Sequence, residues 1–308
     1  MSLPTRLARA ALRRMVATGA SSTSGGRGSE GVTAPPPQTI ALDYPVRPAP
    51  RYGYGRPPHP GLHQLIDAGR NGYEQVLRSF LGYADGLGRI ELDSADLHQP
   101  SWHNGWFQGL DAIALYCLLG ETRPARYVEI GSGHSTRFAR RAISDLGLPT
   151  RIRSIDPQPR AEIDGLCDEL IRRPLEEVGP DAISDVAAGD IVFFDNSHRC
   201  FTNSDVTVAF LELLPDLPPG VLVQFHDIFL PWDYPPQMSD RYYSEQYLLA
   251  TALLSGARLE VILPNFYVSI SPELYHVLDP IWDRFVWSAT PTNGLSFWVR
   301  TAPAATAG

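Results

Sequence analysis

The sequence predicts an α/β fold, a doubly wound and mostly parallel sheet with an N-terminal helical cap. Between residues 126 and 300, short apolar segments alternate with segments of helical periodicity, and this alternation favours parallel strands with helices packed on both faces. The segment 126–136 also runs from an apolar strand through a glycine turn into a helix. Such a turn is typical of a ligand-binding unit at the open edge of a parallel sheet.

The elements follow from the periodicity of apolar residues. We expect helices over 61–87 and 105–119 to form the cap, and further helices over 135–146, 161–171, 206–214 and 242–254. Strands are expected over 126–130, 151–155, 190–194, 220–225, 258–263 and 295–300, with a short strand near 173–175. In the last helix, we expect Tyr243, Tyr247, Leu248 and Leu254 to face inward.

The charge of the chain is unevenly distributed. Residues 1–58 carry eight arginines against Glu30 and Asp43, a net charge of +6. Because the net charge of the whole chain is −8, the remaining residues carry −14. Such an acidic body is a poor ligand for nucleic acid, because phosphate neutralisation dominates that affinity. We therefore expect a small-molecule substrate and no nucleic-acid partner, and the sequence leaves a homo-oligomer open.

Composition also predicts how the chain is divided. Residues 1–60 are basic and rich in Pro, Gly and Ser, so we expect a disordered tail there. Its segment 3–16 is arginine-rich and acid-free, which leaves a transit peptide or a surface-binding helix as alternatives. Residues 61–122 would be the helical cap, 123–302 the ligand-binding domain, and 303–308 a second disordered tail.

Targeting signals and cysteine usage indicate the compartment. No window approaches the roughly 20 apolar residues that a transmembrane helix needs. Cys117, Cys167 and Cys200 lack the spacing of metal ligands and cannot all pair, which favours a reducing, cytoplasmic location. All basic residues are arginine, and with the alanine, glycine and proline content this suggests a bacterial source.

The turn after the first strand predicts the kind of ligand. Gly131 and Gly133 would let the backbone approach a ligand where a Cβ would collide. Glu129 would repel a pyrophosphate but tolerate or attract a cationic sulfonium with an amino-acid head. The third glycine of the dinucleotide fingerprint would fall at Thr136. These residues favour S-adenosylmethionine over NAD, and a helix cap without any ligand is the alternative, since Ser132 and Ser135 are good caps.

Residues Glu129 to Thr136, with Asp156 at the end of the second strand, resemble the first two cofactor motifs of class I S-adenosylmethionine-dependent methyltransferases. The resemblance implies a Rossmann-like methyltransferase fold. It implies that S-adenosyl-L-methionine is bound by Glu129, Gly131, Ser132, Gly133, Ser135, Thr136 and Asp156. Glu129 would contact the amino-acid end of the cofactor, Asp156 the ribose hydroxyls, and residues around Arg173 and Leu175 the adenine.

Polar residues follow two other buried strands. Asp195 and His198 come after one strand, and His226 and Asp227 after the next. Because ligands lie beyond the carboxyl ends of parallel strands, these side chains are expected to converge on one crevice. Carboxylates and imidazoles suit a divalent cation. The alternatives are a turn-capping pair for the first two residues and a structural pair for the other two. Glu245 is expected to be an ordinary residue at the start of a helix and not part of a site.

These two clusters resemble the macrocin and rhamnosyl O-methyltransferase-like enzymes over roughly residues 100–240. The resemblance implies Mg²⁺ or another divalent cation at Asp195 and Asp227, with His226 standing where the pattern has Glu. It implies His198 as the catalytic base, with Asp195 beside it. The expected metal ligands are therefore Asp195, His226 and Asp227, and the expected catalytic residues are His198 and Asp195.

Two further segments are candidates for substrate contacts. The proline-rich loop 231–236 would form a lid, and the aromatic residues of 102–107 would either stack on a substrate ring or belong to the core. Together, these features predict a methyltransferase that acts on a hydroxyl of a small-molecule or glycosyl acceptor. An NAD-dependent oxidoreductase and a non-catalytic methyltransferase-like binding module are the alternatives.

Overall fold

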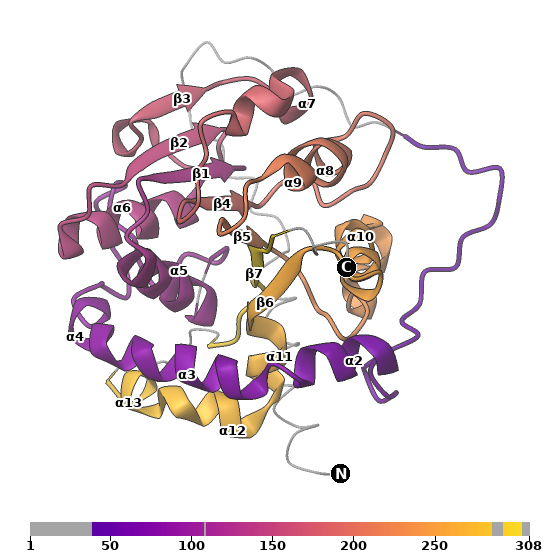
Figure 1. Cartoon of the computed structure of the whole chain (residues 1–308), viewed down its shortest axis with the longest axis horizontal. Coiled ribbons are helices and arrows are strands. Elements are labelled where there is room, and N and C mark those ends of the chain that lie inside the picture. The colour runs from indigo at the N-terminus through magenta and orange to yellow at the C-terminus, as the bar shows by residue number, and fades with distance from the viewer. Residues whose placement is uncertain (1–38, 108, 285–291, 304–308) are drawn as a thin grey trace.

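The computed structural model describes residues 39–107, 109–284 and 292–303. They form a seven-stranded sheet (Figure 1) in the order β3 (Glu169–Ile171), β2 (Arg151–Ile155), β1 (Arg126–Ile130), β4 (Ile191–Phe194), β5 (Leu222–Phe225), β7 (Phe297–Thr301) and β6 (Leu259–Pro264). The first five strands are parallel, and β7 is antiparallel to both of its neighbours. The expected doubly wound, mostly parallel sheet is confirmed.

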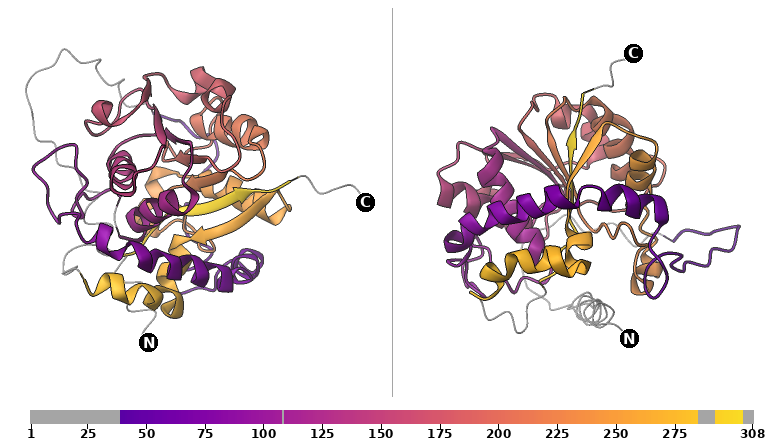
Figure 2. Two further views of the ribbon diagram at one scale, coloured as in Figure 1. Left: turned by 60° about the vertical axis from the view of Figure 1, so that its left-hand side comes forward. Right: turned by 60° about the horizontal axis from the view of Figure 1, so that its bottom comes forward.

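Helices cover both faces of the sheet (Figure 2), as the alternation of strands and helices predicts. The central helices are α5 (Gly109–Thr122), α6 (His134–Leu146) and α10 (Glu245–Leu254), with the shorter α7 (Leu175–Val178), α8 (Asp205–Val208) and α9 (Leu214–Asp216). A π-helical segment, Ala209–Leu213, joins α8 to α9. No helix within the described ranges is long and apolar enough to cross a membrane.

The expected N-terminal cap is present as several helices. It contains α2 (Pro60–Asp67), α3 (Arg70–Phe80) and α4 (Ala84–Leu87), and leads into α5. Tyr73, Leu77 and Phe80 of α3 belong to the same hydrophobic core as the sheet, so the cap is part of one packed body. At its end of the molecule, α3 lies beside α11 (Asn265–Ile270), α12 (Pro272–Tyr275) and α13 (Asp279–Trp282) (Figure 1).

Two expected elements are wrong. The helix expected over 161–171 is a single 3₁₀ turn, Asp164–Leu166, followed by strand β3. The strand expected near 173–175 is instead the start of α7. Strand β3 is three residues long and lies at the edge of the sheet with most of its surface in solvent. An edge strand of this kind carries no continuous apolar run, so its sequence does not reveal it.

Helix α10 is rotated relative to the expectation. Tyr247 and Leu254 were expected to face inward, yet their side chains are 46% and 48% exposed. Leu249, Ala250 and Leu253 are buried instead. After its first two residues the helix is apolar on all sides, so its periodicity does not determine which face meets the core.

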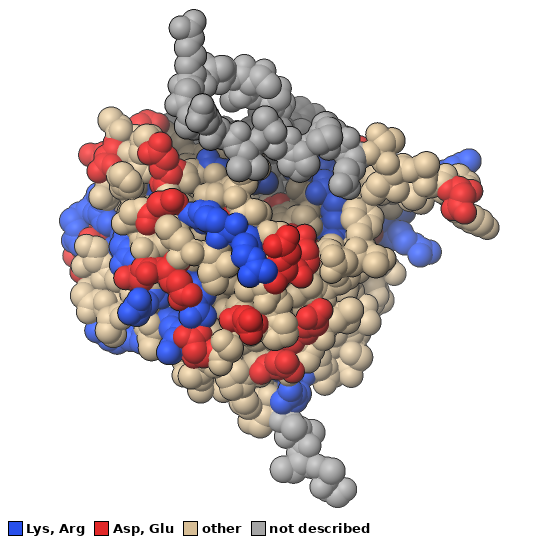
Figure 3. All heavy atoms as spheres, turned by 90° about the horizontal axis from the view of Figure 1, so that it is seen from above, with Lys and Arg blue, Asp and Glu red and all other residues tan. Residues whose placement is uncertain are grey.

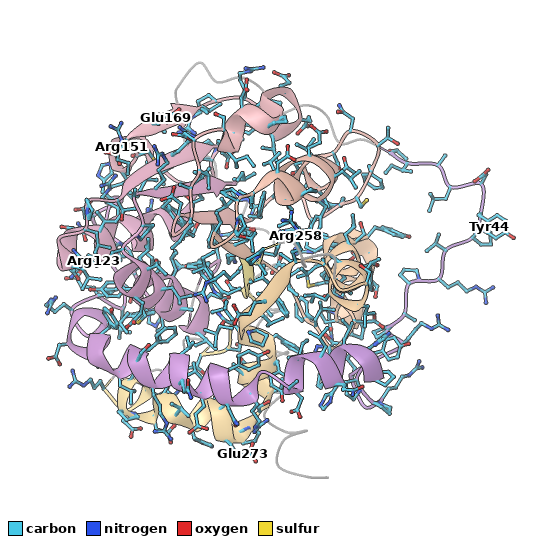
Figure 4. The ribbon with its side chains drawn as sticks, viewed as in Figure 1. Tyr44, Arg123, Arg151, Glu169, Arg258 and Glu273 are labelled. Atoms are coloured by element: carbon cyan, nitrogen blue, oxygen red, sulfur yellow. The ribbon has the colours of Figure 1, made fainter. Side chains whose placement is uncertain are left out.

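The expected tail of residues 1–60 is attached to the body over its last part. The N–H groups of Arg51 and Tyr52 donate to Oδ2 of Asp233 at 2.5 and 3.0 Å. The ring of Tyr54 packs edge-on against Trp232, with 5.2 Å between centroids. Residues 39–50 extend away from the body (Figure 3), and Figure 4 labels Tyr44 on this segment. The segment 3–16 and the expected C-terminal tail beyond residue 303 lie outside the described residues.

Two glycines test whether this attachment contributes to stability. Gly53 and Gly55 both have positive φ, +76° and +98°, but a Cβ on Gly53 would lie 2.5 Å from the Trp232 ring, whereas a Cβ on Gly55 meets open space. We expect Gly53→Ala to lower the free energy of unfolding by about 1–3 kcal/mol more than Gly55→Ala, the usual cost of overpacking. Urea unfolding measures the difference, and equal losses would show that this contact does not stabilise the fold.

Candidate functional site

The register of the sheet aligns the ends of four strands. Ile130 of β1 pairs with Ile155 of β2 and Phe194 of β4, and Phe194 pairs with Phe225 of β5. The residues that come next are Gly131, Asp156, Asp195 and His226. They therefore lie side by side at one edge of the sheet. The strand order reverses between β1 and β4, which is where α/β folds bind ligands.

A cavity of about 320 Å³ opens at this edge. Of the expected cofactor-binding residues, Gly131, Ser132, Gly133, Ser135 and Asp156 line it. Its wall also contains Trp106, Phe107, His134, Pro174, Leu175, Asp195, Asn196, Ser197 and Asp205. Leu175, which is expected to contact the adenine, thus lies in the wall. Arg173, Glu129 and Thr136 do not belong to the wall.

Gly131 is required by the protein's own backbone. Its φ is +80°, and a Cβ would lie 1.8 Å from the carbonyl oxygen of Asp195. The turn after β1 and the turn after β4 can approach each other this closely only because position 131 has no side chain. By contrast, a Cβ on Gly133 would meet no atom within 4 Å. Gly133 therefore leaves open space at the turn, and the approach of a ligand to either glycine stays a prediction.

Glu129 lies beneath the turn. Its carboxylate is fully buried and accepts hydrogen bonds from the hydroxyls of Tyr127, at 2.9 Å, and Thr136. The Thr136 oxygen in turn accepts from the Gly133 N–H at 3.0 Å. Burial raises the pKa of Glu129 to about 7, against the lowering effect of the surrounding hydroxyls. In this structure Glu129 supports the turn from below and does not line the cavity. Its contact with the amino-acid end of a cofactor stays a prediction.

Asp156 joins two turns at the side of the cavity. One carboxylate oxygen accepts from the Ser132 N–H at 2.8 Å, and the other accepts from the Gln158 N–H at 2.7 Å. Ser132 also meets Ser154 of β2 through its hydroxyl at 2.8 Å. These bonds hold the glycine turn against the end of the second strand.

Next to the cavity, two imidazoles converge on two carboxylates. Nε2 of His198 lies 3.3 Å from Asp195 and 3.6 Å from Asp227. Nδ1 of His226 lies 3.5 Å from Asp195 and 3.8 Å from Asp227. His198 and Asp227 both have positive φ, 59° and 56°, a backbone state that non-glycine residues adopt mainly where function or packing requires it. The convergence expected from the sequence is present.

Two acids that the sequence analysis missed hold the outer nitrogens of these rings. Nδ1 of His198 lies 2.8 Å from the fully buried Glu245, and Nε2 of His226 lies 3.3 Å from Asp111. Asp111 also accepts from the N–H groups of Leu295 and Ser296. Both acids start helices that are otherwise strongly apolar, and an isolated acid in such a helix is the signal that could have identified them.

The carboxylates decide the charge of the rings. Burial lowers the pKa of His198, but the hydrogen bonds to Asp195 and Glu245 and the charge of Asp227 outweigh it and raise the pKa well above its usual value. The pKa of His226 is likewise raised by Asp195 and Asp111 against the effect of burial. Burial raises the pKa of Asp195, yet the two rings hold it well below the usual range. The carboxylates on both sides of each ring therefore favour its protonated form.

The expected metal site is not evident in this arrangement. Within the part of the chain that the structure describes, no group of three or more His, Cys, Asp or Glu side chains is placed to hold a metal ion. The carboxylate oxygens of Asp195 and Asp227 lie 3.3–3.8 Å from imidazole nitrogens of His198 and His226. The divalent cation at Asp195, His226 and Asp227 stays a prediction from the sequence.

The aromatic segment and the proline-rich loop take different roles. Trp102 and Phe107 belong to the core, whereas Trp106 is 57% exposed at the cavity with the Arg160 guanidinium 4.8 Å above its ring. In the loop, Tyr234 is buried in a small second core with Phe229. The loop 231–236 is thus packed in place in this structure.

The chain is similar to known proteins over part of its length. Residues 128–228 match the family model described as a methyltransferase domain, which spans the glycine turn, Asp156, Asp195 and His226. No curated protein matches the chain. Among solved structures, the SAH-bound methyltransferase PaMTH1 of Podospora anserina is 14% identical with a TM-score of 0.40, over 78% of this chain and 96% of its own.

A second solved structure is the phospholethanolamine N-methyltransferase 2 of Haemonchus contortus, in complex with phosphomonomethylethanolamine and S-adenosylhomocysteine. It is 12% identical with a TM-score of 0.28, over 58% of this chain and 49% of its own. Similarities this low say nothing about activity. The similarity to a methyltransferase domain therefore rests on the family match over residues 128–228, about a third of the chain.

Proposed function

We propose that this protein is an S-adenosylmethionine-dependent methyltransferase that methylates a hydroxyl oxygen of a small-molecule or glycosyl acceptor. One observation carries the proposal. The glycine turn, Asp156 and the imidazole–carboxylate cluster meet at a single edge of the sheet, within the residues that match a methyltransferase domain. A cytoplasmic location, a bacterial source and the absence of a nucleic-acid partner stay predictions.

The volume and the lining of the cavity suit S-adenosylmethionine. Its volume of about 320 Å³ lies within the range of small-molecule sites. Asp156 stands in its wall with a carboxylate that can accept hydrogen bonds from ribose hydroxyls, and Leu175 supplies an apolar surface for an adenine ring. Ser132 and Ser135 offer hydroxyls near the glycine turn, and Gly133 leaves open space beside them.

His198 is the group that we assign as general base. Its Nδ1 is held by Glu245, so Nε2 is directed to the space between Asp195 and Asp227. In the reaction, the acceptor oxygen forms a bond to the methyl carbon while the carbon–sulfur bond breaks, and the electron pair stays on sulfur. The proton of the acceptor hydroxyl passes to Nε2 of neutral His198. Positioning and proton removal are the two contributions that the protein makes to such a displacement.

Gly133 allows the cofactor assignment to be tested without a clash of the new Cβ against other atoms of the protein. A leucine at this position would extend into the space that is open in the structure. We expect Gly133→Leu to abolish binding of S-adenosylhomocysteine in calorimetry, while Gly133→Ala keeps it and both variants keep the circular dichroism spectrum of the native chain. NAD should not bind. Gly131 is unsuitable for this test, because any side chain there meets the backbone of Asp195. Unchanged binding in Gly133→Leu, or binding of NAD, would remove the assignment.

The role of His198 predicts both a rate and a pH dependence. The raised pKa of His198 means that the neutral ring prevails only above that pKa, so turnover should rise with pH into the alkaline range. His198→Ala should lower turnover by about 10²-fold with little change in cofactor affinity. Glu245→Gln removes one acid that raises this pKa, so the rising limb should move to lower pH.

Glu260→Gln is the matched control for the pH profile, because Glu260 is a largely exposed acid on β6. Its profile should coincide with that of the native chain. If His198→Ala keeps near-native turnover while His226→Ala does not, His226 is the base and the assignment is reversed.

Chelation tests whether a divalent cation assists the reaction. Because the rings of His198 and His226 lie beside the carboxylates of Asp195 and Asp227 and can balance their charge, we expect exhaustively chelated protein to keep its turnover. Loss of turnover that added Mg²⁺ restores would show that the carboxylates rearrange to bind a cation, as the resemblance to the macrocin-type enzymes implies. Asp195→Ala, compared in the same assay, should lower turnover whether or not a cation is added.

A further inference from the structure

Two arginines beside the imidazole–carboxylate cluster have no acid as a partner. Arg199 donates from Nε and Nη1 to the carbonyl oxygens of Arg241 and Ser197, at 2.9 and 3.1 Å. Arg241 donates to the hydroxyl of Tyr243 at 3.2 Å. Among the residues that the structure describes, neither guanidinium has a carboxylate within the 4.0 Å of an ion pair. Neutral oxygens hold both groups in place without compensating their charge.

Two adjacent cations of this kind are unusual for an acidic body. The residues after position 58 carry a net charge of −14, and other arginines of the body are paired. Arg126 and Arg153, for example, lie 2.8 and 2.6 Å from Asp185. Guanidinium groups that are fixed by neighbours and still lack a counter-charge form a local site for an anion.

The same two arginines lie close to the proposed general base. The ring of Tyr243, which is half-buried, packs on the ring of His198 with 4.7 Å between centroids. The guanidinium carbons of Arg199 and Arg241 lie 5.1 and 5.7 Å from the centre of the Tyr243 ring. A single aromatic ring therefore separates both guanidinium groups from the imidazole of His198.

The arginines lie on the side of the cluster that the proposed cofactor does not use. The residues assigned to the cofactor follow β1 and β2, whereas Arg199 follows β4 and Arg241 precedes α10. The cavity wall includes Ser197, to which Arg199 is bonded, but neither arginine. In a direct displacement the acceptor oxygen approaches the methyl carbon from the side opposite to sulfur. An acceptor at His198 would therefore extend away from the cofactor, toward the arginines.

We propose that the methyl acceptor carries an oxyanion group, a phosphate or a carboxylate, which Arg199 and Arg241 bind while its hydroxyl lies at Nε2 of His198. The inference rests on the proposed function and adds the class of acceptor. A guanidinium presents parallel N–H donors that match the oxygens of either anion. The two arginines select the acceptor and orient its hydroxyl, and the proton transfer remains with His198.

Calorimetry with pyrophosphate and citrate as probes tests the anion site. We expect the native chain to bind at least one of them, and Arg199→Gln and Arg241→Gln each to weaken that binding about tenfold or more, the scale of a lost hydrogen bond to a charged group. Arg258→Gln is the matched control, because Arg258 (labelled in Figure 4) is exposed and donates only to the Pro215 carbonyl, at 3.3 Å. It should bind as the native chain does. Absence of binding, or binding that the first two substitutions leave unchanged, overturns the proposal.

Arg241→Gln is the decisive variant, because it removes one bond to a hydroxyl, whereas Arg199 joins two loops through carbonyl groups. Arg241→Lys keeps the charge and should lose less affinity for the probes than Arg241→Gln. Both variants should bind S-adenosylhomocysteine as tightly as the native chain does. A loss of that affinity would mean that the arginines bind the carboxylate of the cofactor, and would overturn the assignment to the acceptor.

Methyl transfer tests the class of acceptor directly. A metabolite extract is separated on an anion exchanger, and each fraction is incubated with the native chain and S-adenosylmethionine that carries an isotopically labelled methyl group. We expect the label in products of the retained, anionic fraction, and a neutral labelled product overturns the proposal. Failure of the native chain to bind S-adenosylhomocysteine would count against the proposed function alone, because binding of pyrophosphate or citrate at the arginines needs no cofactor.

Discussion

The common level at which β1, β2, β4 and β5 end is the constraint on which the rest of the site depends. It places the residues that follow each strand in one row, although they are far apart in sequence. The absence of a side chain at Gly131 then lets two of the following turns approach to backbone contact. A change at that glycine would move Asp195, and with it the imidazole rings that Asp195 holds. The glycine turn and the charged cluster thus behave as one mechanical unit rather than as two neighbouring motifs.

Each charged group of the cluster faces a group of opposite charge. Glu245, His198, Asp195, His226 and Asp111 follow one another as alternating acids and bases. Each ring is bound at both nitrogens, so neither can rotate without losing a charged partner. Removing one member would leave an uncompensated charge in the interior, which costs far more than the pair contributes. The same arrangement orients His198, because Glu245 holds Nδ1 and directs Nε2 toward Asp195 and Asp227.

The sequence was sufficient to predict the central strands and the side chains that meet where these strands end. Strands 126–130 and 151–155 have the expected bounds, and Asp195, His198, His226 and Asp227 converge as expected, because parallel strands present their carboxyl ends together. The partners Glu245 and Asp111 were missed, since they lie 47 and 115 residues from the rings that they bind. The rotation of α10 was wrong because a helix that is apolar all round has no preferred face in its sequence. The pairing of Glu129 with Thr136 beneath the turn was also missed, because sequence position does not say on which side of a turn a carboxylate lies.

The buried carboxylate of Glu129 has a consequence for ligand uptake. Its pKa of about 7 means that near neutral pH it is protonated in a substantial share of the molecules. A positively charged ligand held above the turn would favour the ionised form, even without touching it, because Coulomb attraction is little screened in the interior. Occupation of the cavity would then expel a proton from beneath it. Affinity for a cation would rise with pH through neutrality, while affinity for an uncharged analogue would not. The Glu129 carboxylate beneath the turn would in this way distinguish the charged ligand from its neutral counterpart.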